Sequence, residues 1–466
     1  MAVRWFCEIV LLLVCGVGPG MCLFNLYPRI TQIPVRGDPG QPLFLTPLIE
    51  AGKIREAQKA ARVGPLKGTN VTSYAGLLTV NKQFNSNLFF WFFPVESNDP
   101  NAAVVLWLQG GPGATSLFGL FTEHGPFSVK DKYYLKPRKY SWTKTHSVIY
   151  IDNPVGTGYS FTDSDDGYTR NETAVGEDLY NAILQFFQLF PDLQKNEFYI
   201  TGESYAGKYV PALSYTIHTK NPGAKQKINL KGLAIGNGLC DPEHMLKYGD
   251  YLYQIGLIDV NAREIFHQQE SQGIKYIQEK KWDKAFDVFD ELLNGDMHSK
   301  SVFYNVSGFT FYYNYLHDKG SGNDDVGSYV QLTNVRRAIH VGNLTFHTDD
   351  KVEQHLKEDV MQSVKPWVEA LLDHYRVLVY NGQLDIIVAY PLSLGFLQAL
   401  DWSGAAAYKT APRAKWHVGS ELAGYAKTVE NLTELLVRDA GHMVPSDQPK
   451  WALDLINRFT ANKPFQ

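Results

Sequence analysis

The stretch Thr201-Gly202-Glu203-Ser204-Tyr205-Ala206-Gly207 follows the short apolar run 198–200 and precedes a segment with helical periodicity. A strand, a sharp turn between small residues, a serine and a helix form the sequence context of a nucleophile elbow, in which the serine hydroxyl stands clear at the end of a sheet. The usual elbow has glycine two residues after the serine, where this chain has Ala206 and then Gly207. Taken alone, the stretch also fits an ordinary turn, or a helix capped by Ser204.

Apolar and amphipathic segments alternate on both sides of this turn. Strands are predicted at 74–80, 88–93, 104–108, 148–151, 198–200, 228–235, 377–380, 416–418 and 432–437, the first two as an antiparallel pair. Helices are predicted at 49–61, 175–190, 335–339, 360–372 and 451–459. This alternation predicts an α/β domain with a mostly parallel central sheet, and with the elbow it predicts an α/β-hydrolase fold.

Changes in composition divide the chain into five parts. Arg4, the apolar run 9–17 and the small residues at 20–22 predict a secretory signal peptide. The strand and helix alternation stops near Asp241, and a polar helical segment follows, which predicts an inserted helical cap. The predicted organisation is a signal peptide at 1–22, an N-terminal extension or pro-segment at 23–69, two parts of the hydrolase domain at 70–240 and 331–466, and the cap at 241–330.

Charge and cysteine usage exclude several classes of protein. The chain has 44 Lys and Arg against 48 Asp and Glu, a balance that argues against nucleic acid as a partner. No run approaches the ~20 apolar residues of a membrane span, so none is expected. Only Cys240 lies beyond the signal peptide, so we expect no disulfide and a buried, inert thiol. No cluster has the spacing of metal ligands, and neither a metal nor a cofactor is expected.

Five N-glycosylation sequons accompany the signal peptide. One sequon arises easily by chance, but five after an export signal favour a glycoprotein of the secretory pathway, either lysosomal or secreted. Some of them also fit sites that the glycosylation machinery does not reach. The acceptor positions are Asn70, Asn171, Asn305, Asn343 and Asn431.

A carboxylate and a histidine follow later strands at positions that suit a catalytic triad. Asp385 lies in the loop after the predicted strand 377–380, and His442 follows the strand 432–437. Catalytic groups of such sheets gather beyond the carboxyl ends of the strands, and the chain order Ser, Asp, His is the one expected for this fold. Each residue alone also fits an ordinary loop position. Together they predict Ser204 as nucleophile, His442 as general base and Asp385 as the group that orients it.

An oxyanion hole needs two N–H groups that point at the developing negative charge. The residue after the nucleophile, Tyr205, supplies one. The glycine-rich loop 110–113 follows the apolar strand 104–108 and supplies the other, with Gly111 as the expected donor. A simple tight turn is the alternative explanation of this loop.

Three segments together resemble the serine carboxypeptidase family: 107–116 (WLQGGPGATS), 202–211 (GESYAGKYVP) and 441–445 (GHMVP). The resemblance runs from about Ser73 to the C-terminus. It implies removal of single residues from the C-termini of peptides or proteins, usually at acidic pH. It also implies that the terminal carboxylate is held at the positions of Gln109, Gly110, Glu123 and Glu203.

Two departures from the family pattern are visible. The family more often has asparagine at the position of Gln109, and many relatives have a disulfide-bonded cysteine at the position of Ala114. The two glutamates can bind the carboxylate of a substrate only if they are not both ionised, because two ionised carboxylates repel a third carboxylate. At least one of Glu123 and Glu203 must therefore be protonated, and binding should weaken as the pH rises past their coupled pKa.

Two other functions remain open at this point. An acyltransferase on the same scaffold would pass the acyl group to an alcohol, and a non-catalytic binding protein would keep the fold alone. The sequence does not give the preferred terminal residue, the physiological substrate, proteolytic processing or the oligomeric state, for which a homodimer is one alternative.

Overall fold

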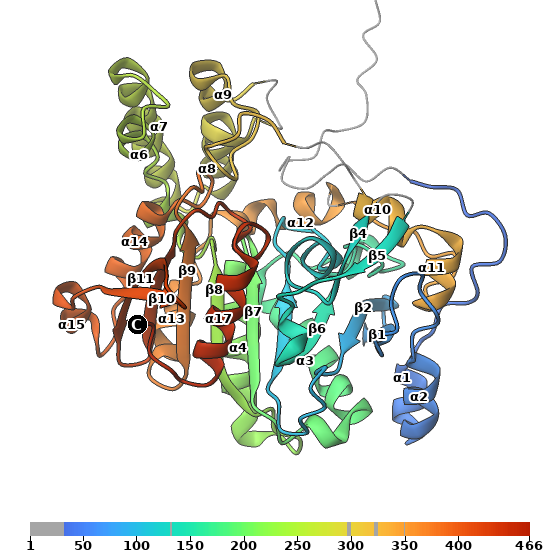
Figure 1. Cartoon of the computed structure of the whole chain (residues 1–466). Coiled ribbons are helices and arrows are strands. Elements are labelled where there is room, and N and C mark those ends of the chain that lie inside the picture. Colours follow the sequence, from blue (N-terminus) through green and yellow to red (C-terminus); the bar gives the residue numbers. More distant parts are fainter. Residues whose placement is uncertain (1–31, 131–132, 296–299, 321–324, 349) are drawn as a thin grey trace, which may run out of the picture.

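The computed structural model describes residues 32–130, 133–295, 300–320, 325–348 and 350–466, so the predicted signal peptide lies outside the described residues. A ten-stranded sheet forms its centre (Figure 1). Across the sheet the strands are β1 (Tyr74–Asn81), β2 (Ser86–Phe93), β6 (Ser147–Ile151), β3 (Val104–Leu108), β7 (Phe198–Glu203), β8 (Leu230–Gly236), β9 (Arg376–Gly382), β12 (Leu432–Val437), β11 (Glu421–Val429) and β10 (Ala414–Val418).

The predicted mostly parallel sheet is confirmed. Neighbouring strands from β6 to β12 pair in parallel, and the strands at both edges pair antiparallel. The antiparallel pair predicted at the first edge is β1 with β2, in a register that places Leu78 opposite Leu88. The prediction missed β11 and a separate hairpin of β4 (Phe127–Lys130) and β5 (Tyr134–Pro137). All three strands mix buried and exposed residues, so no apolar run marks them.

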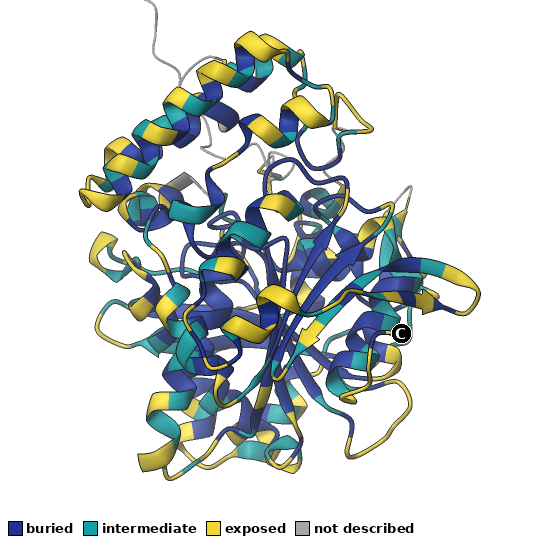
Figure 2. Ribbon diagram, turned by 90° about the vertical axis from the view of Figure 1, so that its left-hand side faces the viewer, coloured by how far each residue is buried: buried dark blue, intermediate teal, exposed yellow. Residues whose placement is uncertain are grey.

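Helices cover both faces of the sheet because its strands are apolar on both sides. Along β3, Leu106 and Leu108 belong to one core cluster while Val105 and Trp107 belong to the other. Figure 2 shows the buried sheet between outer layers that are partly exposed. The first cluster packs under α3 (Glu172–Leu189), α4 (Ala206–Lys220) and α13 (Lys365–Leu372), and the second under α10 (Asp325–Val330), α11 (Thr333–Ala338) and α17 (Pro449–Thr460).

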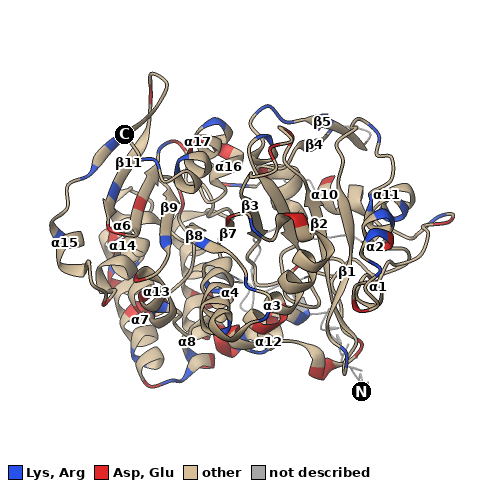
Figure 3. Ribbon diagram, turned by 90° about the horizontal axis from the view of Figure 1, so that it is seen from below, with Lys and Arg blue, Asp and Glu red and all other residues tan. Residues whose placement is uncertain are grey.

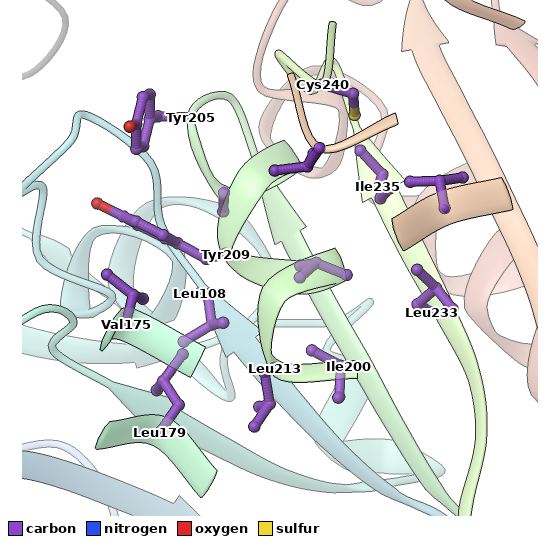
Figure 4. Close-up of a cluster of buried hydrophobic side chains, with 14 of the residues drawn as sticks. Leu108, Val175, Leu179, Ile200, Tyr205, Tyr209, Leu213, Leu233, Ile235 and Cys240 are labelled. Atoms are coloured by element: carbon purple, nitrogen blue, oxygen red, sulfur yellow. The ribbon is translucent and has the colours of Figure 1, made fainter. Parts of the chain in front are cut away.

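The close-up in Figure 4 shows the layer beneath the elbow helix. Leu213 of α4 and Leu179 of α3 lie over Leu108 of β3 and Ile200 of β7. All four side chains are fully buried, which stabilises each by about 1.5–3 kcal/mol relative to exposure. The position of the elbow is therefore set by close packing of α4 against two central strands.

Two predicted helices are each interrupted. The predicted segment 360–372 contains only the last residue of α12 (Asp350–Val360) and then α13, whose first turn holds Pro366, a residue without the N–H that a continuous helix requires. The segment 49–61 forms α1 (Thr46–Glu50) and α2 (Ile54–Ala61), separated at Gly52, whose φ is +70°.

The segment predicted as a cap contains helices that stand above the sheet in Figure 1. Its tyrosines contact the loop after β9, where Tyr251 Oη donates to the Asp385 carbonyl at 2.9 Å and Tyr248 Oη to that of Ile387 at 2.8 Å. The exact domain boundaries stay a prediction. The helices here are α5 (Pro242–Met245), α6 (Gly249–Gln254), α7 (Val260–Gln278), α8 (Trp282–Phe289), η7 (Asp290–Asn294) and α9 (Val302–Ser307).

The remaining short elements connect the layers. They are η1 (Gly119–Glu123), η3 (Trp142–Lys144), η4 (Asp165–Gly167), η5 (Pro191–Leu193), η6 (Asn221–Gly223), α14 (Tyr390–Ala399), α15 (Ala405–Thr410) and α16 (Val444–Asp447). Acidic and basic residues are interspersed over the peripheral helices in Figure 3, in keeping with the balanced charge. Among the described residues, no helix is both long and apolar enough to cross a membrane.

One fully buried cation ties the elbow helix to α12. Lys208 Nζ lies 2.6 Å from Asp359 Oδ2, and the side chain of Lys208 is 0% exposed. Tyr205 Oη donates to the same carboxylate oxygen at 3.3 Å. A buried charge that loses its partner is costly, so this pair is a sensitive point of the fold.

We expect Lys208→Met to lower the free energy of unfolding by about 3–5 kcal/mol, because it leaves Asp359 buried and unpaired. Lys220→Met on the same helix is the matched control. Lys220 pairs with Glu177 at 2.7 Å, but both side chains are roughly 40% exposed, so its loss should cost less than about 1 kcal/mol. Urea unfolding curves measure both values, and equal losses would contradict the prediction.

Candidate active site

The elbow holds Ser204 in a strained backbone conformation. Its φ is 64°, in the left-handed region that non-glycine residues rarely adopt. A Cβ atom at Gly202 would lie 2.7 Å from the Ala206 side chain, and one at Gly207 would lie 2.7 Å from the Gly238 backbone. The two glycines are thus required by close approach, whereas the methyl group of Ala206 fits. The residue that caps α4 is Tyr205, so the helix-capping explanation of Ser204 is wrong.

Asp385 and His442 meet across neighbouring loops at the carboxyl ends of β9 and β12. Asp385 Oδ2 lies 2.8 Å from His442 Nδ1, and both side chains are 0% exposed. The carboxylate accepts the Nδ1 hydrogen, so Nε2 is left as the basic nitrogen. Nε2 is buried and has no hydrogen-bond partner within the described structure. This arrangement suits an imidazole that takes a proton from a third group.

Several residues that sequence reasoning missed fix these two side chains. Asn237 follows β8, the strand between β7 and β9, and its Nδ2 donates to Asp385 Oδ2 at 2.7 Å. The His442 N–H donates to the Tyr313 carbonyl at 2.7 Å, and the two rings pack with centroids 5.1 Å apart. Asn237 stands in a Gly-Asn-Gly turn at the end of a predicted strand, which is a usable signal. Tyr313 carries no such signal.

The glycine loop after β3 packs directly on the elbow. A Cβ atom at Gly110 would lie 2.5 Å from the Tyr205 nitrogen and 2.7 Å from the Ser204 Cβ, so no larger residue fits there. The next residue, Gly111, has a φ of +108°. The turn closes where the Ala114 N–H donates to the Gly110 carbonyl at 3.0 Å. The loop and the Tyr205 N–H thus lie together beside the serine.

Gln109, Glu123 and Glu203 form one buried polar cluster. Gln109 Nε2 lies 3.1 Å from Glu123 Oε1 and 3.0 Å from Glu203 Oε1. Trp107 Nε1 donates to Gln109 Oε1 at 2.8 Å, which orients the amide so that its nitrogen faces the carboxyls. Gly119 leaves room for this bond, since a Cβ atom there would lie 2.2 Å from Trp107 Nε1.

Burial raises the pKa of both glutamates. The pKa of Glu123 rises to about 7, chiefly through loss of solvation. The pKa of Glu203 lies well above its usual range through burial and, next, the neighbouring charge of Glu123. Glu123 Oε2 and Glu203 Oε2 are buried, and neither has a hydrogen-bond partner within the described structure. Below neutral pH the cluster therefore holds a proton that it can donate.

The remaining predicted positions lie outside this site. Asn70, Asn171, Asn305 and Asn343 are exposed, whereas Asn431 is half-buried and its Nδ2 already donates to the Leu372 carbonyl at 2.8 Å. Cys240 is buried, as predicted, and the inertness of its thiol stays a prediction. Among the described residues, no group of three or more His, Cys, Asp or Glu side chains is placed to hold a metal ion.

Comparisons with known proteins agree with this geometry. The family model described as serine carboxypeptidase matches residues 65–462. The chain is 59% identical to the venom serine carboxypeptidase of Apis mellifera, over 95% of this chain and 96% of that one. It is 50% identical to the probable serine carboxypeptidase CPVL of Homo sapiens, over 96% and 95%.

A solved structure shows the same fold. The prohormone-processing carboxypeptidase from Saccharomyces cerevisiae superimposes with a TM-score of 0.74 over 87% of this chain and 96% of that one, at 22% identity. The resemblance inferred from the three motifs is thus confirmed over nearly the whole described chain, and the protein belongs to the serine carboxypeptidase family.

Proposed function

We propose that the protein is a serine carboxypeptidase that releases single residues from the C-termini of peptides through an acyl-enzyme intermediate. Family membership supports the reaction class. The observation that carries the substrate class is the buried pair Glu123 and Glu203, held together by Gln109. Glu203 directly precedes Ser204 in the sequence. A general esterase has no use for two protonatable carboxyls at this place, whereas recognition of a terminal carboxylate needs such a donor.

Each step of the reaction has a candidate group. Ser204 Oγ attacks the carbonyl of the last peptide bond while His442 Nε2 takes its proton, and Asp385 stabilises the imidazolium through Nδ1. The Gly111 and Tyr205 N–H groups receive the oxyanion. His442 then protonates the leaving amine, and the terminal residue departs. In the second half of the reaction His442 takes a proton from water, the water attacks the acyl-enzyme, and His442 returns the proton to Ser204 Oγ as the acyl group leaves.

Substrate recognition requires that the glutamate pair be partly protonated. Below the raised pKa of Glu123, about 7, one carboxyl donates to the other or to the substrate carboxylate. The Gly110 N–H lies in the loop against Tyr205 and is the proposed second donor. Above that pKa Glu123 becomes negative, and at higher pH Glu203, whose pKa is also raised, loses the last proton. The pair then repels the substrate carboxylate, so KM should rise with pH.

The same protonation supports an acidic working compartment. We propose that the protein travels the secretory pathway and acts in a lysosome-like or extracellular acidic space. The exposed sequons at 70, 171, 305 and 343 are compatible with export, and one relative is named as a venom enzyme.

Fluorophosphonate labelling tests whether the serine is activated. We expect the wild-type protein to be labelled on Ser204, and Ser204→Ala and His442→Ala to lose labelling. Asn237→Ala should slow it, because Asp385 loses a 2.7 Å hydrogen bond that holds it against the imidazole. If the wild type is unlabelled at every pH, the protein is a non-catalytic member of its family.

Hydrolysis of an N-blocked dipeptide, compared with its C-terminal amide, tests the substrate class. A carboxypeptidase should release a free amino acid from the acid form and cleave the amide far more slowly, whereas an esterase would treat both alike. Transfer of the acyl group to an added alcohol in preference to water would instead indicate an acyltransferase.

The variant Glu203→Gln tests the role of the shared proton. For the wild type we expect KM to begin rising as the pH passes about 7, where Glu123 ionises, and to rise further as Glu203 loses the last proton, with kcat changing less. In the variant the amide donates at every pH, so the rise in KM should flatten while the rate of Ser204 labelling is retained. Glu279→Gln is a suitable control, since Glu279 lies on the exterior beyond α7. A wild-type KM that is constant from acid to alkaline pH would contradict this mechanism.

A further inference from the structure

Asp152 is a buried carboxylate, 1% exposed, that the mechanism above does not use. It follows β6, the parallel neighbour of β3, and so stands at the sheet edge where the glycine loop begins. Its Oδ1 accepts from Thr115 Oγ1 at 2.5 Å and from the Ser116 N–H at 3.1 Å. Both donors belong to the loop that carries Gln109 and Gly111.

The connection continues to the main chain of Gln109, whose side-chain amide holds the two glutamates. Ser116 Oγ accepts the Gln109 N–H at 3.1 Å. Asp152 therefore holds Ser116, and Ser116 holds Gln109, whose side chain faces the two glutamates. On its other side, Asp152 Oδ2 accepts the Tyr159 N–H at 3.0 Å. A Cβ atom at Gly158 would lie 2.1 Å from Oδ2, so the chain approaches closely around this carboxylate.

We propose that Asp152 is a positioning residue of the active site, which fixes the 109–116 loop so that the oxyanion donor and the carboxylate-binding amide share one geometry. It touches no substrate. Its contribution is to anchor the Thr115–Ser116 end of the loop directly and the Gln109 end through Ser116. The inference rests on the proposed function, which assigns two roles to the loop: donation to the oxyanion by Gly111 and support of the glutamate pair by Gln109.

The conservative variant Asp152→Asn separates this role from packing. An amide has the size of the carboxylate, but only one of its two arms accepts hydrogen bonds. Whichever way it turns, an N–H of the amide faces either the Thr115–Ser116 pair or the Tyr159 N–H. We expect kcat/KM for a blocked dipeptide to fall about ten- to a hundredfold, with slower fluorophosphonate labelling and a higher KM, because small misplacements of positioned groups cost this much.

Glu434→Gln is the matched control for loss of a buried carboxylate. Glu434 is 2% exposed and accepts from the Tyr390 and Tyr408 hydroxyls, far from the glycine loop. The variant Glu434→Gln should lower the Tm without changing the labelling rate or KM at temperatures below thermal unfolding. Thr115→Val provides a second, milder test, with a smaller effect in the same direction, and Thr115→Ser should restore the wild-type values.

The outcomes are distinguishable. If Asp152→Asn lowers the Tm but keeps wild-type labelling and KM, as expected of Glu434→Gln, the role is only structural and the proposal is overturned. If the wild type is labelled but cleaves no dipeptide, the proposed substrate class fails. The labelling rates of Asp152→Asn and Thr115→Val still decide the positioning role in that case.

Discussion

The strained turn at Ser204 is the constraint on which the rest of the site depends. A non-glycine residue at a φ of 64° persists only where its surroundings hold it. Here the Ser204 N–H donates to the Gly236 carbonyl at 3.1 Å, and the Ser204 carbonyl accepts the Leu239 N–H at 3.0 Å, so the end of β8 holds the serine on both sides. The same tight backbone brings Gly110 against the elbow and leaves no room for side chains between them.

Buried charge is handled in three ways around this turn. Lys208 and Asp359 neutralise each other directly at 2.6 Å. Asp385 receives hydrogen bonds from an amide, an imidazole and a backbone N–H. Glu123 and Glu203 form no ion pair with any described residue, and burial raises the pKa of both so that a proton is retained. The third solution leaves a group whose charge changes near neutral pH, which is why recognition of the substrate should follow pH.

The sequence predicted the placement of the main groups because parallel strands end at one edge. Once strands were expected before Ser204, Asp385 and His442, their meeting followed from topology. Asn237 was missed although it obeys the same rule, because an asparagine in a glycine turn has no distinctive chemistry by itself. Periodicity also failed at β11, whose half-exposed residues resemble a loop, and at Val360, where the predicted helix 360–372 joined the last residue of α12 to α13. Side-chain orientation, such as the Trp107 bond that turns the Gln109 amide, was beyond any pattern.

The longer amide at position 109 shows how a departure from the family pattern is accommodated. Glutamine in place of asparagine extends the amide by one methylene, and Gly119 leaves space for it beneath Trp107. Both amide hydrogens are then engaged by the carboxyls of Glu123 and Glu203. In the proposed mechanism the amide therefore acts first on the two acids and only through them on the substrate. In this mechanism the hydrogen bond to the terminal carboxylate of the substrate is therefore donated by the proton that the glutamate pair retains. Substrate affinity then depends on pH more strongly than it would with a free amide as the donor.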